Sequence, residues 1–518
     1  MIHKNAGKLS ETKIDFKTLV ENFYKPQGQI LPVKFGTSGH RGKLGEGFCD
    51  IHVKAIAYAV AKYHKENNIT GSVMVGGDTR ILSDKIAITC AEVLTAENIP
   101  VILCTVPTPT PVFAYEILKA KSAVAGLNGT ASHNPPEDMG LKYNPSNGGP
   151  ATADITKKLE QYANQIISNS SEIKTITLEE AKQKGLLKKM GISQNYIKDL
   201  GSILDFEKIR TSPKKLALHP MGGTGLVYFE EIKKHYKLDN VDILNKVIDP
   251  SFSHIPQDHD GKVRMDPSSI YPMKPLIDIV KTGKYDFAGA CDPDADRFGC
   301  ATKYGELINP NHALCIILEY LLSTKKFPSG VKVARTIATT HLLDKISEKY
   351  KVPILETDVG FKYFAKDLEE NKLVMGCEES AGVNIYNWTT DKDGILAVFL
   401  LAEIMTTTGK DLSELYAEII KTYAIPNYKR VDIPTTTEQK EKIKKIDAST
   451  LKGVSLGGGK VVDIRTTDGI KLYGENCWIL IRPSGTEPII KLYAESFVNS
   501  QHLDTIINEA YELFGLKK

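Results

Sequence analysis

Three aspartates stand at alternate positions in the segment Asp292-Pro-Asp294-Ala-Asp296-Arg297, directly after an apolar run. Carboxylates this close repel one another unless a cation neutralises them, and hard divalent cations prefer oxygen ligands. A helix–loop–helix calcium site requires Gly at its sixth position and Glu at its twelfth, but Arg297 and Lys303 stand there. A solvated turn is the structural alternative. The adjoining arginine favours a Mg²⁺ site that works on a phosphorylated substrate.

The segment Thr130-Ala-Ser132-His133-Asn134-Pro135 contains a hydroxyl and an imidazole side by side. Ser, Asn and Pro are turn formers, so a plain turn is one interpretation. The other makes Ser132 a nucleophile or phosphate carrier, with His133 and the later Lys142 managing protons or charge. No G-x-S-x-G pattern surrounds Ser132, which argues against an α/β-hydrolase.

Two further segments combine arginine, hydroxyls and glycine. Arg482-Pro-Ser484-Gly485-Thr486-Glu487 offers a planar guanidinium, two hydroxyls and exposed backbone N–H groups, which suit a phosphate. The segment 35–42, which includes Arg41, has a similar composition. A simple strand-to-helix loop is the alternative for the first segment.

Paired carboxylates and a hydroxyl lie between glycines in Gly376-Cys-Glu378-Glu379-Ser380-Ala-Gly382. Such groups can exchange hydrogen bonds with vicinal sugar hydroxyls, although a surface turn explains the motif equally well. Downstream, Lys392 lies between two aspartates and could reach a substrate phosphate or oxygen.

Short apolar strands alternating with amphipathic helices must position these loops. The pattern predicts helices at Ile51–Lys65 and Lys85–Glu97, and strands at Ser72–Gly76, Pro100–Cys104, Lys215–Leu218, Phe287–Cys291, Val331–Ile337, Pro353–Leu355 and Leu373–Met375. From about Val431 the sequence becomes polar and glycine-rich. After this stretch the pattern predicts strands at Trp478–Ile481 and Ile489–Glu495 and a helix near Asp504–Phe514. We therefore expect three α/β domains, 1–212, 213–325 and 326–430, and a smaller α+β domain, 431–518.

Composition excludes several classes of protein. A chain of 518 residues is too long for one core. Its net charge of +3 gives no case for a nucleic-acid or membrane partner. Eight cysteines without a C-x-x-C pair indicate buried free thiols in a reducing compartment, with an isolated disulfide as the alternative. The amino terminus has no apolar signal core. We expect a cytoplasmic protein; its oligomeric state stays open.

Five segments together resemble the α-D-phosphohexomutase superfamily. Its signatures read T-S-G-x-R-G, T-A-S-H-N-P, D-P-D-x-D-R, G-E-x-S and R-P-S-G-T-E, and they occur here in family order between Lys34 and Glu487. The fourth departs from the pattern, because Cys377 follows Gly376; Glu378 is the match and Glu379 the runner-up. Asn128, just before the serine segment, stands where an apolar residue is common.

The resemblance implies three α/β domains with mixed sheets and a fourth, mobile domain around a central cleft. It also implies the roles of individual residues. The catalytic residues would be Ser132, His133, Lys142 and Arg41; the Mg²⁺ ligands Ser132, Asp292, Asp294 and Asp296; the substrate-binding residues Arg297, Lys362, Glu378, Ser380 and Lys392; and the phosphate-binding residues Arg482, Ser484, Gly485 and Thr486.

The implied reaction converts glucose 1-phosphate to glucose 6-phosphate through phosphoserine, with glucose 1,6-bisphosphate as intermediate and activator. The resemblance is nearest to bacterial phosphoglucomutases. Mannose and glucosamine phosphate mutases usually read G-E-M-S-G-H or G-E-Q-S-G-H in the fourth signature, whereas this chain reads E-E-S-A-G. A phosphopentomutase, a phosphosugar phosphatase and a non-catalytic scaffold protein are the remaining alternatives.

Overall fold

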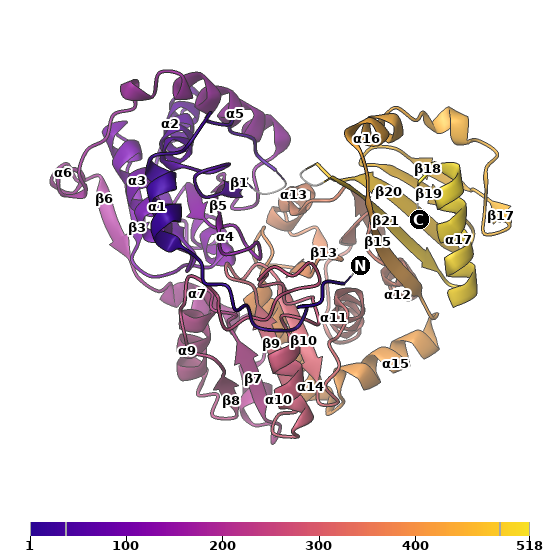
Figure 1. Ribbon diagram of the computed structural model, residues 1–518. Coiled ribbons are helices and arrows are strands. Elements are labelled where there is room, and N and C mark those ends of the chain that lie inside the picture. Colours follow the sequence, from indigo (N-terminus) through magenta and orange to yellow (C-terminus); the bar gives the residue numbers. More distant parts are fainter. Residues whose placement is uncertain (1, 37–38, 486–487, 517–518) are drawn as a thin grey trace. The chain divides into compact units, whose positions relative to one another are not determined.

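The computed structural model describes residues 2–36, 39–485 and 488–516, which form two compact units (Figure 1). The first unit comprises Met1–Pro310, Phe361–Gly376 and Ser380–Leu412. The second comprises Asn311–Gly360, Cys377–Glu379 and Ser413–Lys518.

A six-stranded mixed sheet with the order β1-β5-β4-β2-β3-β6 forms the start of the first unit. Strands β2, β3, β4 and β6 are parallel, whereas β5 is antiparallel to both β1 and β4. Strand β2 is buried throughout, as expected for a parallel strand covered on both faces. The elements of this part are α1(Phe16–Tyr24), β1(His40–Lys43), α2(Asp50–Glu66), β2(Val73–Gly77), α3(Ser83–Ala96), β3(Val101–Cys104), α4(Thr110–Leu118), β4(Ala125–Gly129), β5(Asp138–Asn144), α5(Ala153–Ile167), η1(Ser170–Glu172), α6(Leu178–Gln183) and β6(Leu187–Met190).

A second mixed sheet of the first unit has the order β10-β9-β7-β8. Its elements are α7(Gln194–Leu200), α8(Phe206–Arg210), β7(Leu216–His219), α9(Gly225–Tyr236), β8(Val241–Ile243), α10(Lys274–Lys281), β9(Phe287–Cys291) and β10(Phe298–Thr302). Helix α14(Gly394–Thr408) packs against β9, β10 and α8 and is buried from Gly394 to Met405, which explains why it is apolar on all sides. η2(Phe361–Tyr363), α13(Ala365–Glu369), β13(Leu373–Glu378) and β14(Gly382–Ile385) precede it.

The second unit begins with α/β elements and ends with an antiparallel sheet. Strands β11 and β12 pair in parallel. The C-terminal sheet has the order β15-β21-β20-β19-β18, and α17 packs against β21, β20 and β15 (Figure 1). The elements are α11(Pro310–Thr324), β11(Lys332–Thr336), α12(Leu342–Lys349), β12(Ile354–Thr357), α15(Leu412–Thr422), β15(Asn427–Pro434), α16(Thr437–Lys444), η3(Ala448–Leu451), β16(Ser455–Leu456), β17(Gly459–Lys460), β18(Asp463–Arg465), β19(Ile470–Tyr473), β20(Cys477–Pro483), β21(Ile489–Ser496) and α17(Ser500–Leu513).

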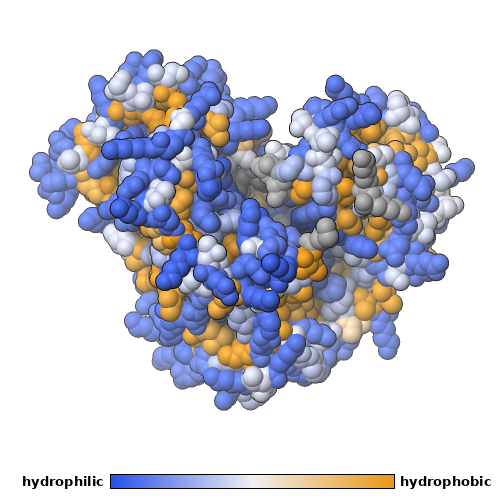
Figure 2. All heavy atoms as spheres, in the orientation of Figure 1, coloured by the Kyte–Doolittle hydropathy of each residue, from blue (hydrophilic) through white to orange (hydrophobic). Residues whose placement is uncertain are grey.

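The expected fold class is confirmed: mixed sheets in α/β parts are followed by an antiparallel α+β part. The expected central cleft and the four domain boundaries stay predictions. All eight cysteines are free, and only Cys104 among them is not fully buried. Hydrophilic side chains predominate on the face shown in Figure 2. In the part of the chain that the structure describes, no helix is long and apolar enough to cross a bilayer.

Candidate active site

Ser132 lies in the loop that joins β4 to β5 and adopts a left-handed backbone conformation, with φ of +54°. This conformation is costly for a residue with a side chain, so surrounding contacts must hold it. The Thr130 hydroxyl accepts the Ser132 backbone N–H at 2.9 Å and donates to the Asp78 carboxylate at 2.6 Å. These two hydrogen bonds of Thr130 therefore hold the loop in place beside Ser132, the candidate nucleophile.

Arg80 binds four backbone carbonyls of the same loop. One terminal nitrogen donates to the carbonyls of Pro135 and Asp138 at 2.7 and 3.1 Å, and the other to those of Ser132 and Asn134 at 2.5 and 2.6 Å. The guanidinium is buried. A rigid planar fork is suited to this task, since each donor points in a fixed direction.

The aspartate loop between β9 and β10 meets Ser132 directly. The Ser132 hydroxyl donates to Asp292 Oδ2 at 2.6 Å, and the Arg297 backbone N–H donates to Asp292 Oδ1 at 3.0 Å. Gly394 donates its N–H to the Ala295 carbonyl, and a Cβ at Gly394 would lie 2.3 Å from the Arg297 carbonyl oxygen. A glycine is therefore required at the start of α14 for this close approach.

The aspartate triad fits a divalent cation. Asp292, Asp294 and Asp296 are buried, and each offers one carboxylate oxygen within 4.8 Å of the others. Burial, together with the charges of its two neighbours, raises the pKa of Asp292 well above its usual range. Among the described residues, Asp294 Oδ1 and Asp296 Oδ1 have no hydrogen-bond partner although both are buried. Hard cations bind oxygen donors of this kind.

Two lysines neutralise part of this charge. Lys142 Nζ, on β5, lies 2.5 Å from Asp294 Oδ2 and 2.9 Å from Asp296 Oδ2, and Lys392 Nζ lies 3.4 Å from Asp296 Oδ2. Burial opposes the charged form of Lys142, but the carboxylates of Asp294 and Asp296 outweigh it and raise the lysine pKa. Lys142 is therefore an ammonium group.

His133 and Arg297 lie beside the triad. His133 Nδ1 is 3.4 Å from the Ser132 hydroxyl oxygen, and its backbone carbonyl accepts the Met265 N–H. Burial, reinforced by the charge of Arg297, lowers the pKa of His133 well below its usual range. Arg297 lies 3.9 Å from an Asp266 carboxylate oxygen. The imidazole therefore lies within reach of the Ser132 hydroxyl.

The first unit also holds Arg41, Ser380 and Lys362. Arg41 is on β1 opposite Gly140 of β5. Burial lowers the pKa of Arg41, and the charges of Asp294 and Asp296 oppose that shift. Ser380 precedes Ala381, whose carbonyl accepts the N–H of Phe298 next to Arg297. Lys362 lies in η2, whose Phe361 ring is 5.8 Å from Lys392 Nζ.

The second unit holds the other candidates. Glu378 is buried and accepts the Gly360 N–H at 3.0 Å, whereas Glu379 accepts the Thr336 hydroxyl at 3.3 Å. Arg482 is the penultimate residue of β20, just before Ser484 and Gly485 in the chain, and Lys440 Nζ donates to the Ser484 carbonyl at 2.8 Å. Thr486 lies outside the described residues.

Comparison with known proteins decides the family. Four models described as phosphoglucomutase/phosphomannomutase match in order: alpha/beta/alpha domain I at residues 32–170, domain II at 194–305, domain III at 309–423 and the C-terminal domain at 430–513. A phosphoglucomutase from Komagataeibacter xylinus is 35% identical over 96% of this chain and 94% of its own length. The chain belongs to the phosphoglucomutase/phosphomannomutase family.

Two other relatives agree with this family. A phosphoglucomutase/phosphomannomutase from Thermococcus kodakarensis is 28% identical over 89% of this chain and 94% of its own length. The open form of parafusin, a phosphoglucomutase from Paramecium, has the same fold, with a TM-score of 0.76, 21% identity and coverage of 94% of this chain and 98% of that one. The chain is therefore an enzyme of a phosphomutase family.

Sequence reasoning missed two residues that support the family's serine and aspartate loops, Arg80 and Thr110, whose hydroxyl donates to Asp294 Oδ2 at 2.6 Å. It noted Asn128 only as a departure from the family pattern, whereas the Asn128 amide donates to the Thr110 hydroxyl at 2.9 Å. Asn128 is buried on β4 and is the register partner of Lys142 on β5. A polar residue inside an otherwise apolar strand was the only signal available.

Proposed function

We propose that this enzyme interconverts α-D-glucose 1-phosphate and glucose 6-phosphate through a phosphoserine at Ser132. The observation that carries the proposal is the 2.6 Å hydrogen bond from Ser132 to Asp292, at a buried carboxylate triad next to Lys142. Nucleophile, acidic triad and ammonium group are the parts that phosphoryl transfer needs.

In the proposed forward reaction the phosphoryl group leaves the Ser132 oxygen and bonds to the 6-hydroxyl oxygen of glucose 1-phosphate. The proton of that hydroxyl passes to the neutral imidazole of His133, while the ammonium of Lys142 stabilises charge on the transferring group. The 1-phosphoryl group of the resulting glucose 1,6-bisphosphate then leaves the sugar O1 oxygen and bonds to the Ser132 oxygen, and the O1 oxygen takes the proton that His133 had accepted.

Asp292, Asp294 and Asp296, with the phosphorylated Ser132, would hold Mg²⁺. Bound there, the ion would act as a Lewis acid toward a phosphoryl oxygen. Asp294 Oδ1 and Asp296 Oδ1, which accept no hydrogen bond from any described residue, support the assignment. Arg41 and Arg297 add positive charge beside the triad.

We propose that the remaining candidates bind the substrate. Glu378 and Ser380 would contact sugar hydroxyls, and Lys362 and Lys392 substrate oxygens. A phosphate that does not react would be held by Arg482, Ser484, Gly485 and Thr486. Glucose is favoured over mannose and glucosamine because the sugar segment reads E-E-S-A-G and because the Komagataeibacter xylinus relative is a phosphoglucomutase.

A coupled assay tests the proposal. Purified enzyme receives Mg²⁺, a trace of glucose 1,6-bisphosphate and glucose 1-phosphate, with mannose, glucosamine and ribose 1-phosphates in parallel. Rapid formation of glucose 6-phosphate that disappears in Ser132→Ala is the expected result. Activity on another sugar alone would contradict the glucose assignment, and steady release of inorganic phosphate would indicate a phosphatase.

A further inference from the structure

The segment that follows β12 binds the β18–β19 hairpin at successive residues. Asp358 Oδ1 accepts hydrogen bonds from Arg465 Nη2 at 2.7 Å and from the Thr467 hydroxyl at 2.6 Å. The next backbone N–H, that of Val359, donates to Asp468 Oδ2 at 3.0 Å. The one after it, that of Gly360, donates to Glu378 Oε1 at 3.0 Å. Residues 358–360 therefore join the hairpin to the sugar-binding candidate.

Asp468 also holds the phosphate-binding candidate. Both of its carboxylate oxygens lie 2.9 Å from Arg482 Nε, and the two side chains are 24% and 23% exposed. The β18–β19 hairpin can approach β20 closely because Gly469 has φ of +94° and carries no side chain. A Cβ at Gly469 would lie 2.4 Å from the Ile481 carbonyl oxygen. One carboxylate thus contacts both Arg482 and the Val359 N–H.

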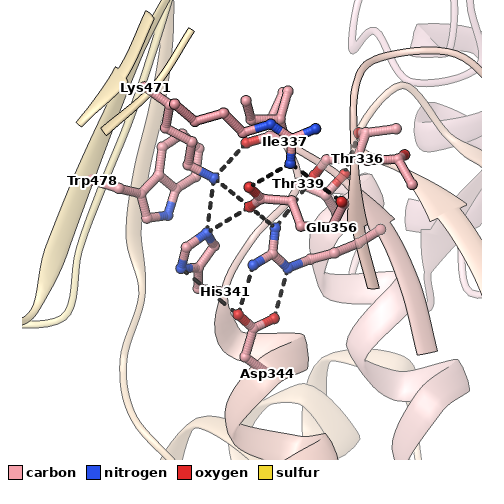
Figure 3. Close-up of polar contacts among 12 residues, drawn as sticks. Thr336, Ile337, Thr339, His341, Asp344, Glu356, Lys471 and Trp478 are labelled. Carbon is pink, nitrogen blue, oxygen red and sulfur yellow. Dashed lines mark hydrogen bonds and ion pairs between the residues drawn. The ribbon is translucent and has the colours of Figure 1, made fainter. Parts of the chain in front are cut away.

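A buried cluster of charges fixes the same segment at its start (Figure 3). Lys471 Nζ, on β19, donates to Glu356 at 2.8 Å, to the Ile337 carbonyl at 2.6 Å and to His341 at 2.9 Å. Arg335 donates to the same Glu356 at 2.5 Å. Lys471 is fully buried, so the hairpin and the end of β12 are held by contacts that exclude water.

We propose that Asp468 is a positioning residue that orients Arg482 for phosphate and fixes it relative to Glu378 through residues 359–360. The proposal rests on the proposed function, in which Arg482 and Glu378 bind one phosphosugar. A guanidinium held at Nε has its planar fork oriented before the ligand arrives, so less rotational freedom is lost on binding. Asp468 acts through Arg482 and touches no substrate itself.

A double-mutant cycle tests the proposal. In a Ser132→Ala background, which prevents turnover, the affinity for glucose 6-phosphate is measured by calorimetry with Mg²⁺. We expect Asp468→Asn to weaken binding about tenfold, a typical effect of losing one charge-assisted contact. In an Arg482→Ala background the same change should alter affinity less than about twofold, because coupled residues are not additive. Asp463→Asn, an exposed aspartate of β18, is the control and should bind like the parent.

The cycle separates the possible failures. A loss from general loosening of the hairpin would persist in the Arg482→Ala background and would overturn the proposal. Parental affinity in Asp468→Asn would overturn it while leaving the proposed function intact. Additive losses from Asp468→Asn and Glu378→Gln would overturn the link through residues 359–360. If the parent binds no phosphosugar at all, the proposed function itself fails, and this inference fails with it.

Discussion

Three residues with side chains adopt left-handed backbone conformations at the candidate loops. Ser132, Ala295 and Ala381 have φ of +54°, +54° and +67°. Such conformations are costly and persist where the surroundings impose them. In the serine loop these contacts come from Arg80 and Thr130, and in the aspartate loop from Gly394. The position of the candidate catalytic side chains therefore depends on neighbouring residues that have no proposed role in the reaction.

Thr110 orients the Asp294 carboxylate and should matter for metal binding. Its hydroxyl occupies Asp294 Oδ2, which leaves Oδ1 for a cation. We expect Thr110→Val to weaken Mg²⁺ binding about tenfold, as for other residues that support metal ligands. Calorimetric titration with Mg²⁺ measures the effect. Thr95→Val is the control, because the hydroxyl of this buried threonine bonds only within α3 in the described contacts; equal affinities in the two variants would contradict the role of Thr110.

Removing the Lys142 ammonium should make the enzyme depend on Mg²⁺ for stability. Lys142→Met leaves Asp294 and Asp296 with less compensating charge, which we expect to cost about 3 kcal/mol in the metal-free protein. Added Mg²⁺ should then raise the melting temperature more in the variant than in the parent, because the cation replaces lost positive charge. Thermal unfolding with EDTA and with Mg²⁺ measures both quantities. An equal Mg²⁺ shift in the two proteins would argue against this account.

At the scale of elements, Arg80 links helix α3's leading loop to the serine loop. Arg80→Met leaves four loop carbonyls without these donors, and we expect a loss of about 3 kcal/mol in the free energy of unfolding. Urea unfolding measures the loss. Arg210→Met removes an exposed ion pair with Glu207 and should change the free energy of unfolding far less than Arg80→Met does, because solvent screens exposed ion pairs. Similar losses in both variants would refute the special role of Arg80.

Local patterns predicted the elements well and their supporting contacts poorly. The strand Phe287–Cys291 was predicted with its observed bounds, and the predicted helix Ile51–Lys65 lies within α2. These segments are defined by the periodicity of their own side chains. Arg80, in contrast, binds the carbonyl of Ser132, 52 residues later in the chain, and Asp468 binds Arg482, 14 residues later. No local pattern marks such partners, because the fold alone brings them together.

The candidate site shows the same contrast between residues that a local motif predicts and residues that only the fold brings together. Ser132, His133, Lys142 and the aspartate triad were found because their motifs carry recognisable chemistry, and the structure brings them within contact distance. Thr110 and Asn128 carry no motif, and their importance follows from the register of β4 and β5 and the position of α4. Residue types and motifs can therefore predict catalytic candidates, whereas the residues that hold those candidates in place are identified only from the three-dimensional structure.

At the scale of the whole molecule, the Lys471 cluster predicts a pH dependence of stability. Burial, reinforced by the charge of Arg335, lowers the pKa of Lys471 to about 7. An unfolded lysine titrates near pH 10.4, so between these values the unfolded chain binds one more proton than the folded one. The free energy of unfolding therefore rises with pH over this window, by up to about 1.4 kcal/mol per pH unit. Below about pH 7 the slope falls to zero, because Lys471 is protonated in both states and its destabilising effect is complete.

Unfolding in urea from pH 6 to pH 9 checks this slope. Trp478 reports on the cluster, because Lys471 Nζ lies 4.2 Å from its ring centroid, and Trp388→Phe removes the other tryptophan. The Lys471→Met variant lacks the titrating group and should show a smaller rise with pH. Parallel curves for the two proteins would show that Lys471 does not titrate in this range.

Buried free thiols in both units allow the opening of each unit to be measured. Cys90, Cys291 and Cys300 lie in the first unit and Cys315, Cys377 and Cys477 in the second, all of them buried. Burial also raises the pKa of Cys90 and of Cys315, which keeps the reactive thiolate scarce. Brief exposure to an alkylating reagent should therefore mark these cysteines only in molecules whose surrounding unit has opened. Peptide masses would then report the opening rate of each unit separately, without any engineered cysteine.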